Sequence, residues 1–375
     1  MERTDVAIIG GGLIGCASAY YLTRAGLKVT VLDQGRLGSE ASWAGAGMLG
    51  AQVELAEPTP AVSLAIPSRA MYPDLAKTLR EETGIDIGYQ AGGIMLVALT
   101  EADAEQYQAR LRWQVGQGLR AEWLTPGETR ELEPELKGDF LGALHLPDDH
   151  QVSSPLVAQA LAAAARRRGA ILREGARVHG FLTEGSRVIG VRTATGDLVA
   201  EWVVLAAGAW SGALAAKIGL DLPVRPVKGQ MLALRMPWLP AGRTIFSSGC
   251  YLLPKCDGRI LVGASMEEVG FDKRPTLGVL NGMAEAATRL IPALREASFE
   301  SAWAGLRPGN PDDLPFIGLV EGRPGLIVAT GHFRKGILMA PITGRIVEAL
   351  VTGAKPPVDL RPFDPARRFD ARSGL

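Results

Sequence analysis

Cysteine is scarce in this chain, with only three among 375 residues: Cys16, Cys250 and Cys256. An odd count without a C-x-x-C pair argues against a disulfide framework and against a zinc site, and it is typical of a reducing compartment. The first residues lead directly into an apolar strand pattern, which leaves no room for a secretory signal. We therefore expect a cytoplasmic protein.

Net charge and long apolar runs are also missing. Lysine plus arginine and aspartate plus glutamate each total 40, so the formal net charge is +0. A chain with this balance has no overall field that would attract nucleic acid or anionic lipid. No apolar stretch reaches the ~18 residues of a membrane-spanning helix. The sequence predicts neither a nucleic-acid partner nor a membrane span.

Histidine is rare as well, with four residues in the chain. His145 and His150 lie near Asp148 and Asp149, but their spacing matches no recognisable set of metal ligands. The pattern favours a solvated loop at this point, and no metal site is expected.

The chain does contain a complete dinucleotide-binding fingerprint. The β-branched, apolar run of residues 5–9 predicts a buried strand, and the G-x-G-x-x-G of residues 10–15 follows it at once. Residues 16–25 predict a helix that ends at Gly26, and residues 28–32 predict a second strand that ends in Asp33. This order of elements is typical of a domain that binds a dinucleotide.

Each part of the fingerprint has a physical role. Gly10 permits the tight turn out of the strand, Gly12 lets a pyrophosphate approach the backbone, and Gly15 lets the helix pack closely on the sheet. The helix N-terminus offers unpaired N–H groups and a positive dipole end to phosphates. Asp33 can accept hydrogen bonds from ribose hydroxyls, which favours FAD or NAD over NADP.

Small residues dominate positions 35–50, which follow the second strand. Such a stretch cannot form a bulky core layer, so its backbone can lie close to a flat group. Two interpretations stay open for it. It is either a flexible loop, or a loop and helix start that cover the phosphates and part of a cofactor ring.

The strand-then-glycine pattern returns twice, at residues 202–211 and 325–331, and the second return precedes a helix at 337–351. Both returns predict segments that meet the same sheet beside the cofactor. Just before the first return, residues 188–192 and 199–202 predict a hairpin. Further strands predict an antiparallel platform, and helices are expected at 68–83, 101–117, 155–168 and 277–290.

We therefore expect an α/β protein with two domains. A Rossmann-like cofactor-binding domain would be discontinuous, and a second, α+β domain with a mostly antiparallel sheet would hold the substrate. The expected boundaries are 1–86, 149–218 and 305–375 for the first domain, and 87–148 and 219–304 for the second.

Over nearly its whole length the chain resembles the amine-oxidising flavoproteins of the D-amino acid oxidase superfamily, and within it the glycine oxidases of the thiamine pathway. The most specific shared stretches are residues 10–33, Ala-Gly-Ala-Gly-Met-Leu-Gly at 44–50, Val-Lys-Gly at 227–229, Cys-Tyr-Leu-Leu-Pro at 250–254, Trp-Ala-Gly-Leu-Arg-Pro-Gly at 303–309 and Gly-His-Phe-Arg-Lys-Gly-Ile-Leu at 331–338.

The resemblance implies that FAD is bound non-covalently. By position it assigns cofactor contacts to Leu13, Ile14, Asp33, Gln34, Ala41, Ser42, Ala46, Gly47, Met48, Val178, His332, Phe333, Arg334, Lys335, Gly336, Ile337 and Leu338. Two positions depart from the family pattern. Asp33 stands where glutamate is usual, and Gly249 stands where relatives carry a histidine, a change that would widen the pocket.

For the substrate, the resemblance implies that Arg307 holds a carboxylate, that Tyr251 lies beside it, and that Arg334 is a further contact on the carboxylate side. A planar guanidinium is a natural carboxylate clamp because it donates two parallel hydrogen bonds. Without the resemblance, Arg307 could equally be paired with an acid, and Tyr251 could be a core aromatic residue. No general base is evident, so we expect solvent to take the amine proton.

The expected activity is oxidative deamination of glycine and other small amines, such as sarcosine and small D-amino acids, with molecular oxygen as acceptor. The products would be a 2-oxo acid (glyoxylate), ammonia or an amine, and hydrogen peroxide, in supply of thiamine thiazole synthesis. Family members are often homotetramers. Two alternatives remain: a D-amino acid or proline dehydrogenase that reduces a quinone, and a non-catalytic flavin-binding interaction protein.

Overall fold

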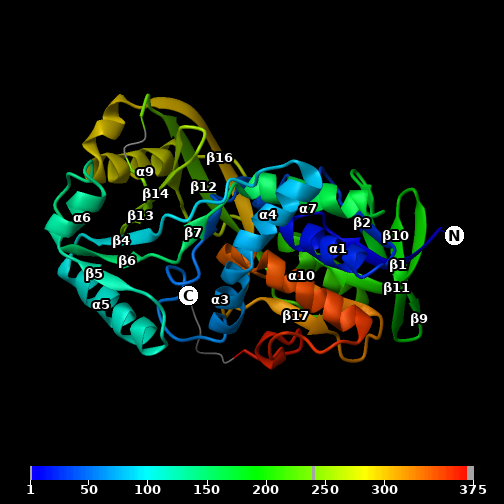
Figure 1. Cartoon of the computed structure of the whole chain (residues 1–375). Coiled ribbons are helices and arrows are strands. Elements are labelled where there is room, and N and C mark those ends of the chain that lie inside the picture. Colours follow the sequence, from blue (N-terminus) through cyan, green and yellow to red (C-terminus); the bar gives the residue numbers. More distant parts are fainter. Residues whose placement is uncertain (1, 239–240, 370–375) are drawn as a thin grey trace.

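The computed structural model describes residues 2–238 and 241–369, and two large mixed β-sheets with flanking helices form its framework (Figure 1). Both sheets are needed for the site, because one carries the glycine-rich turns and the other carries Arg307 and Tyr251. The α/β class expected from the sequence is confirmed.

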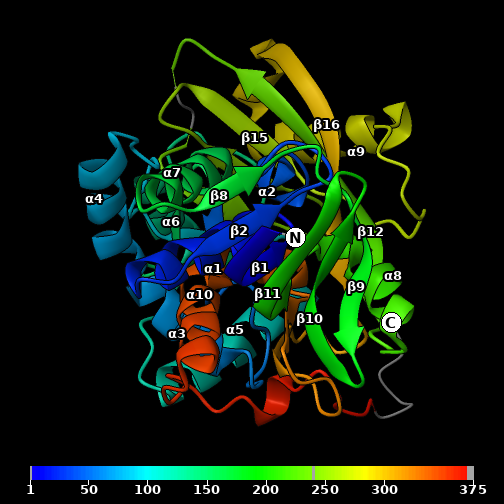
Figure 2. The ribbon, with the colours of Figure 1, turned by 90° about the vertical axis from the view of Figure 1, so that its right-hand side faces the viewer.

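The first sheet is built around parallel strands. Its order is β17 (Phe316–Leu319), β18 (Leu326–Thr330), β11 (Gly196–Leu205), β1 (Glu2–Ile9), β2 (Val29–Leu32) and β8 (Ile171–Arg173). The predicted hairpin is present, since β10 (Arg187–Thr193) pairs antiparallel with β11 and also with β9 (Val178–Glu184). Figure 2 shows β9, β10, β11 and β1 one beside another.

The second sheet is mostly antiparallel, as expected. Its order is β16 (Ser298–Gly309), β12 (Arg225–Arg235), β15 (Arg259–Gly263), β14 (Tyr251–Pro254), β13 (Thr244–Phe246), β4 (Ile94–Ala98), β6 (Gly142–Leu146) and β5 (Glu122–Leu124). The β13–β4 pair is its parallel exception. A short pair of strands, β3 (Met48–Leu49) and β7 (His150–Gln151), lies apart from both sheets in the hydrogen-bonding pattern.

The strands divide between the two sheets along the expected domain boundaries. Every strand of the first sheet comes from residues 1–86, 149–218 or 305–375, and those of the second come from 87–148 and 219–304. One strand, β16, crosses the boundary at 304/305. The strand positions support these boundaries, which stay a proposal.

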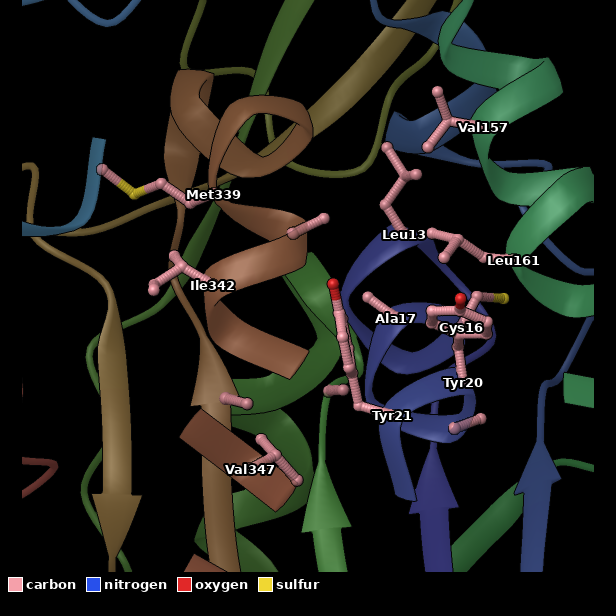
Figure 3. Packing of buried hydrophobic residues seen from close by; sticks show 14 of the residues in the cluster. Leu13, Cys16, Ala17, Tyr20, Tyr21, Val157, Leu161, Met339, Ile342 and Val347 are labelled. Atoms are coloured by element: carbon pink, nitrogen blue, oxygen red, sulfur yellow. The ribbon is translucent and has the colours of Figure 1, made fainter. Parts of the chain in front are cut away.

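Helix α1 (Leu13–Arg24) is the centre of the main core. It contacts α7 (Ser154–Arg167) and α10 (Gly336–Thr352), and Figure 3 shows it between them, with Leu13 toward Val157 and Tyr21 toward α10. Its side chains are almost all buried, because the sheet covers one side and two helices cover others. The N- and C-terminal parts of the chain thus share one core, as expected.

The remaining helices are short or lie on the outside. They are α2 (Ala41–Ala44), α3 (Val62–Ala70), α4 (Tyr72–Thr83), α5 (Glu101–Gly116), α6 (Pro126–Leu132), α8 (Ser211–Ala215) and α9 (Leu277–Leu290). The single helix predicted for residues 68–83 was wrong, since two helices meet at Met71. Pro73 explains the break, because it has no N–H to continue the first helix but fits the first turn of a new one.

Lys255 ties the second sheet to the segment that follows β7. Its Nζ lies 3.1 Å from Gln151 Oε1 and donates to the Val152 carbonyl at 2.9 Å, while Gln151 Nε2 donates to the Pro254 carbonyl at 2.9 Å. No carboxylate of the described residues pairs with this ammonium group, and burial lowers the pKa of Lys255 to about 7.

We predict that Gly344→Ala destabilises the protein. An added Cβ on Gly344 would lie 2.6 Å from Tyr21 Cδ2 and 2.8 Å from the Ala17 carbonyl oxygen, so α10 would have to move off α1. Overpacking of this kind costs about 1–3 kcal/mol of unfolding free energy. The matched control is Gly282→Ala in α9, where an added Cβ meets nothing within 4 Å and should be neutral or stabilising. Chemical denaturation of both variants makes the comparison, and equal stability would contradict the packing argument.

We also predict a pH dependence that comes from Lys255. The folded protein releases this proton near pH 7, whereas the unfolded chain holds it to about pH 10.4. The unfolded chain therefore binds more protons over this interval, and stability from this group rises with pH. The unfolding free energy of wild type should rise relative to that of Lys255→Met between about pH 7 and 9.5. Lys355→Met, at an exposed lysine, should show no such trend. A flat difference for Lys255→Met would refute the shift.

Candidate active site

Two cavities meet where the glycine-rich turns of the first sheet face the second sheet. The larger has a volume of about 300 Å³ and the smaller about 90 Å³. They share five lining residues, Ala41, Gly45, Arg307, Arg334 and Ile337. A ligand in the larger cavity would therefore touch the same side chains as a ligand in the smaller one.

The structure brings the sequence-predicted site residues together around these cavities. Those that line the larger cavity are Gly10, Gly12, Leu13, Ile14, Asp33, Gln34, Ala41, Ser42, Val178, His332, Phe333, Arg334, Gly336 and Ile337. Those that line the smaller one are Ala46, Gly47, Met48, Tyr251, Arg334, Lys335, Ile337 and Leu338. Gly15 lines neither cavity. Its role is packing, because an added Cβ would lie 1.9 Å from the Gly10 carbonyl oxygen.

The larger cavity lies at the carboxyl ends of the parallel strands. Its wall includes the residues that follow β1, β2 and β11, among them the predicted turn at residues 206–210. These turns lie very close together, because a Cβ on Gly10 would be 2.4 Å from the Ala206 carbonyl oxygen. Ligands of open α/β sheets bind at this edge.

The backbone around α1 fits the pyrophosphate and ribose of a dinucleotide. A Cβ added at Gly12 would meet only Ser42 Oγ, at 3.2 Å, and one added at Gly208 would meet nothing within 4 Å, so both glycines leave room over the cavity. The N-cap residue of α1 is Gly12, which has no side chain to cap the helix. Ser42 Oγ accepts the Leu13 N–H at 2.8 Å instead. The free N–H groups and the dipole of this helix end suit phosphate.

Asp33, which the sequence predicts to hold a ribose, lines the larger cavity at the end of β2. Its two carboxylate oxygens accept the N–H groups of Gly11 at 2.7 Å and Gly35 at 2.8 Å. A carboxylate has about four acceptor positions, so lone pairs remain for hydroxyl groups of a ligand. The shorter side chain is thus fixed in place by the backbone around it.

The small-residue stretch at 35–50 forms α2 and β3 and lines both cavities, which favours the second of its two interpretations. Gly47 has φ +97°, and a Cβ there would lie 1.9 Å from the Val152 carbonyl oxygen. This glycine therefore permits contact with a neighbouring segment as well as with a ligand.

The segment at 331–338 joins β18 to α10 through unusual backbone conformations. Gly331 has φ +73° and Phe333 has φ +48°, and strain at a non-glycine residue of this kind is often found at ligand sites. His332 is buried, its Nε2 lies 3.0 Å from Thr343 Oγ1, and burial lowers its pKa to about 3. The imidazole therefore stays neutral, which agrees with assigning it no acid–base role.

The guanidinium of Arg307 lies over a position of the second sheet that has no side chain. Gly229 on β12 pairs with Gly305 on β16, two residues before Arg307, so the arginine side chain lies diagonally across Gly229. A Cβ on Gly229 would be 2.2 Å from Arg307 Nη1 and 2.4 Å from its Cζ. A glycine is therefore required for this position of the guanidinium.

Arg307 has no carboxylate partner among the residues that the structure describes. Its Nη1 donates to the Ser265 carbonyl at 3.0 Å, and the residue lines both cavities. Burial lowers the pKa of Arg307, while Tyr251 and Glu54 oppose that shift. Because an arginine stays protonated in proteins, the cavities contain a cation that can accept an anionic group. This geometry argues against an acid-paired structural arginine.

Tyr251 lines the smaller cavity and lies over Gly263, another position of the second sheet that has no side chain. Tyr251 on β14 pairs with Gly263 on β15, which in turn pairs with Met231 on β12. Because Gly263 has no side chain, Tyr251 Oη reaches Met231 Sδ at 3.1 Å, and a Cβ there would lie 2.4 Å from the sulfur. Burial raises the pKa of Tyr251 to about 12, so its hydroxyl remains a donor.

Arg334 differs from Arg307 in having an acidic partner. Its Nε lies 3.1 Å from Glu54 Oε2, and its Nη2 lies 4.0 Å from Asp313 Oδ2. Glu54 and Lys335 also line the smaller cavity, and burial lowers the pKa of Lys335. The predicted carboxylate-side role of Arg334 stays a proposal, because its guanidinium is already paired.

Sequence reasoning missed Glu54 and the residues that hold it. Asp149 is fully buried, accepts the N–H groups of Gln52 and Val53, and forms a 2.7 Å salt bridge with Arg69. The solvated loop predicted at Asp148–Asp149 was therefore wrong for Asp149. A lone acid in the small and apolar stretch 44–55 was the available signal for Glu54.

Gly249 lines neither cavity; a Cβ there would meet Ala286 at 3.4 Å.

Other kinds of site receive no support from the described part of the chain. Residues 2–238 and 241–369 contain no group of three or more His, Cys, Asp or Glu that could hold a metal ion. Within the same ranges, no helix is long and apolar enough to cross a membrane.

Comparison with known proteins gives one consistent picture. The FAD dependent oxidoreductase family (DAO) matches residues 5–350. Glycine oxidase of Geobacillus kaustophilus is 42% identical over 98% of both chains, and the crystal structure of glycine oxidase from that organism superposes with a TM-score of 0.96 at 41% identity, over 99% of this chain and 100% of the other. The "Bifunctional protein ThiO/ThiG" of Nostoc sp. is 38% identical over 94% of this chain and 53% of its own length.

The match covers both cavities and the strands that form them, and the cradle around Gly12, Asp33 and Gly208 suits the cofactor that gives the family its name. The chain belongs to the FAD dependent oxidoreductase family (DAO) and is an FAD-dependent amine oxidoreductase.

Proposed function

We propose that this protein oxidises glycine and other small amines, such as sarcosine and small D-amino acids, with molecular oxygen as the electron acceptor. The products are glyoxylate or another 2-oxo acid, ammonia or an amine, and hydrogen peroxide. The observation that carries the proposal is the Arg307 guanidinium, which lines a small cavity beside Tyr251 without a carboxylate partner in the described chain. The similarity to glycine oxidases and to ThiO/ThiG supports a role in supply of thiamine thiazole synthesis.

The size of the smaller cavity supports a small substrate. At about 10–15 Å³ for each water-sized group, a cavity of this volume holds roughly six to nine such groups. Met231 and Tyr251 restrict it on the side of the second sheet, and Met48 of β3 also lines it. Glycine, sarcosine and small D-amino acids fit this limit, whereas bulky side chains do not.

Arg307 and Tyr251 would bind and orient the substrate. The guanidinium donates two parallel hydrogen bonds to the carboxylate, and the tyrosine hydroxyl can turn from Met231 Sδ to the same group. Bound FAD supplies the two-electron acceptor for the Cα–H bond. The clamp holds Cα toward the larger cavity, and orientation of this kind can contribute several kcal/mol to a barrier.

Neither Glu54, at the smaller cavity, nor His332, at the larger one, is free to act as a base. Glu54 is paired with Arg334, and the His332 imidazole is bonded to Thr343 and has a pKa of about 3. We propose that the amine binds in its neutral form after it loses a proton to solvent. The walls of the cavity then exclude bulk water while the carboxylate stays bound.

The proposal also covers the residues that contact FAD, the electron acceptor and the oligomeric state of the protein. The residues assigned to FAD keep those assignments, except Gly15, since each of the others lines at least one of the two cavities. A quinone-reducing dehydrogenase of D-amino acids or proline is the alternative for the acceptor. A homotetramer in the cytoplasm is also proposed, on the family resemblance, and sedimentation analysis tests the assembly.

We predict that anaerobic addition of glycine bleaches the flavin absorbance of the purified protein and that air restores it. Peroxide release in air should match glycine consumption, because oxygen then accepts both electrons. Bleaching without peroxide, followed by reoxidation with a soluble quinone, would instead establish the dehydrogenase. A flavin that no small amine bleaches would overturn the proposed function.

We predict that Arg307→Ala raises the KM for glycine while FAD stays bound. Loss of a buried, charge-assisted pair should cost about 2–4 kcal/mol, which corresponds to a roughly 30- to 900-fold change. Arg225→Ala is the matched control, because Arg225 starts the neighbouring strand but pairs with Glu268 at the surface. Steady-state kinetics and the flavin spectrum test both variants, and an unchanged KM in Arg307→Ala would place the clamp elsewhere.

A further inference from the structure

The smaller cavity contains two guanidinium groups in different electrostatic states. Arg307 donates to a backbone carbonyl and has no acidic partner in the described chain, whereas Arg334 is paired with Glu54 at 3.1 Å. Of these two guanidinium groups, Arg307 is available to an anionic ligand and Arg334 is already neutralised. Lys335, a third basic residue in the lining, donates to the Asp313 carbonyl at 3.4 Å. A substrate with a single carboxylate satisfies Arg307 and leaves Arg334 undisturbed.

The chain holds Glu54 in this position firmly. Its side chain is 11% exposed, and the preceding backbone N–H groups of Gln52 and Val53 bind the buried carboxylate of Asp149. Arg110 Nη1 adds a 2.7 Å hydrogen bond to the Val53 carbonyl. The backbone that leads to Glu54 is thus held from two sides, and the ion pair with Arg334 orients its carboxylate.

We propose that Glu54 takes the place that a second substrate carboxylate would occupy on Arg334, and that it thereby restricts the site to amines with one carboxylate. The inference rests on the proposed function, since it names the class of amine acid that this site accepts. Dicarboxylic amines would be excluded because their second carboxylate meets Glu54 instead of a free guanidinium.

Charge repulsion explains why dicarboxylic amines would be the excluded class. Two carboxylates close together repel each other, and a neutralised arginine offers little attraction in return. Specificity that comes from such a repulsive group is common in selective sites. Glu54→Gln retains the size of the side chain, removes the negative charge and frees the planar fork of Arg334 for a ligand.

The test is equilibrium binding of two non-oxidisable ligands, acetate and malonate, to the FAD-loaded protein by calorimetry. We expect Glu54→Gln to bind malonate at least about tenfold more tightly than wild type, with acetate changed by less than about threefold. Asp313→Asn is the matched control, because it removes an acid that lies farther from Arg334, at 4.0 Å, and should give a smaller gain. Equal gains for both ligands, no gain for malonate, or an equal gain in Asp313→Asn would overturn the proposal.

A second variant tests the pairing without altering Glu54. Arg334→Met leaves the Glu54 carboxylate unpaired, so it should weaken the binding of acetate as well as malonate. In the Glu54→Gln background, where no carboxylate is left unpaired, Arg334→Met should abolish the gain for malonate and change the acetate affinity by less than about threefold. A malonate gain that survives in the double variant would show that Arg334 does not receive the second carboxylate, and would overturn the proposal. Because these readouts need no turnover, absence of glycine oxidation would refute the proposed function and leave this inference to be judged on binding alone.

Discussion

The rest of the site depends on a guanidinium that is largely buried and has no acid beside it. Removing a charge from water is unfavourable, and the single carbonyl of Ser265 offsets only part of that cost for Arg307. In the proposed function, an anionic ligand removes this unfavourable term on binding. Every neighbouring feature serves this arrangement: Gly229 makes the space, Gly263 brings in the Tyr251 hydroxyl, and Glu54 neutralises the other arginine.

Two sheets with different tasks meet at this guanidinium. The parallel sheet places glycine-rich turns and the N-terminus of α1 at one edge, where they can surround a dinucleotide. The mostly antiparallel sheet offers a flat wall with missing side chains, on which Arg307 and Tyr251 lie. Packing of α1 between α7 and α10 fixes the turns of the first sheet (Figure 3). The proposed reaction site is thus confined to the space between the two sheets.

Much of this arrangement was predictable from sequence because the signals are local. The strand, glycine turn and helix of residues 5–24 carry their own pattern, and Gly10 and Gly12 were placed correctly at the cavity. Non-local features were harder to predict. Glu54 becomes part of the site only because the distant Asp149 and Arg69 fix its loop, and no pattern near residue 54 records that contact. Gly229 gave no sign of its role either, since the side chain that fills its space comes from residue 307.

Strand β16 has twelve residues, Ser298–Gly309, and carries Arg307 near its C-terminal end, at the cavity. Side chains alternate along a strand, so an insertion or deletion of one residue upstream would turn the guanidinium to the opposite face. The pairing with β12 already contains an irregularity near Phe299, at the far end, where a change of length leaves residue 307 in phase. Over most of β16, evolution and protein engineering can therefore exchange residue types far more freely than they can alter the number of residues.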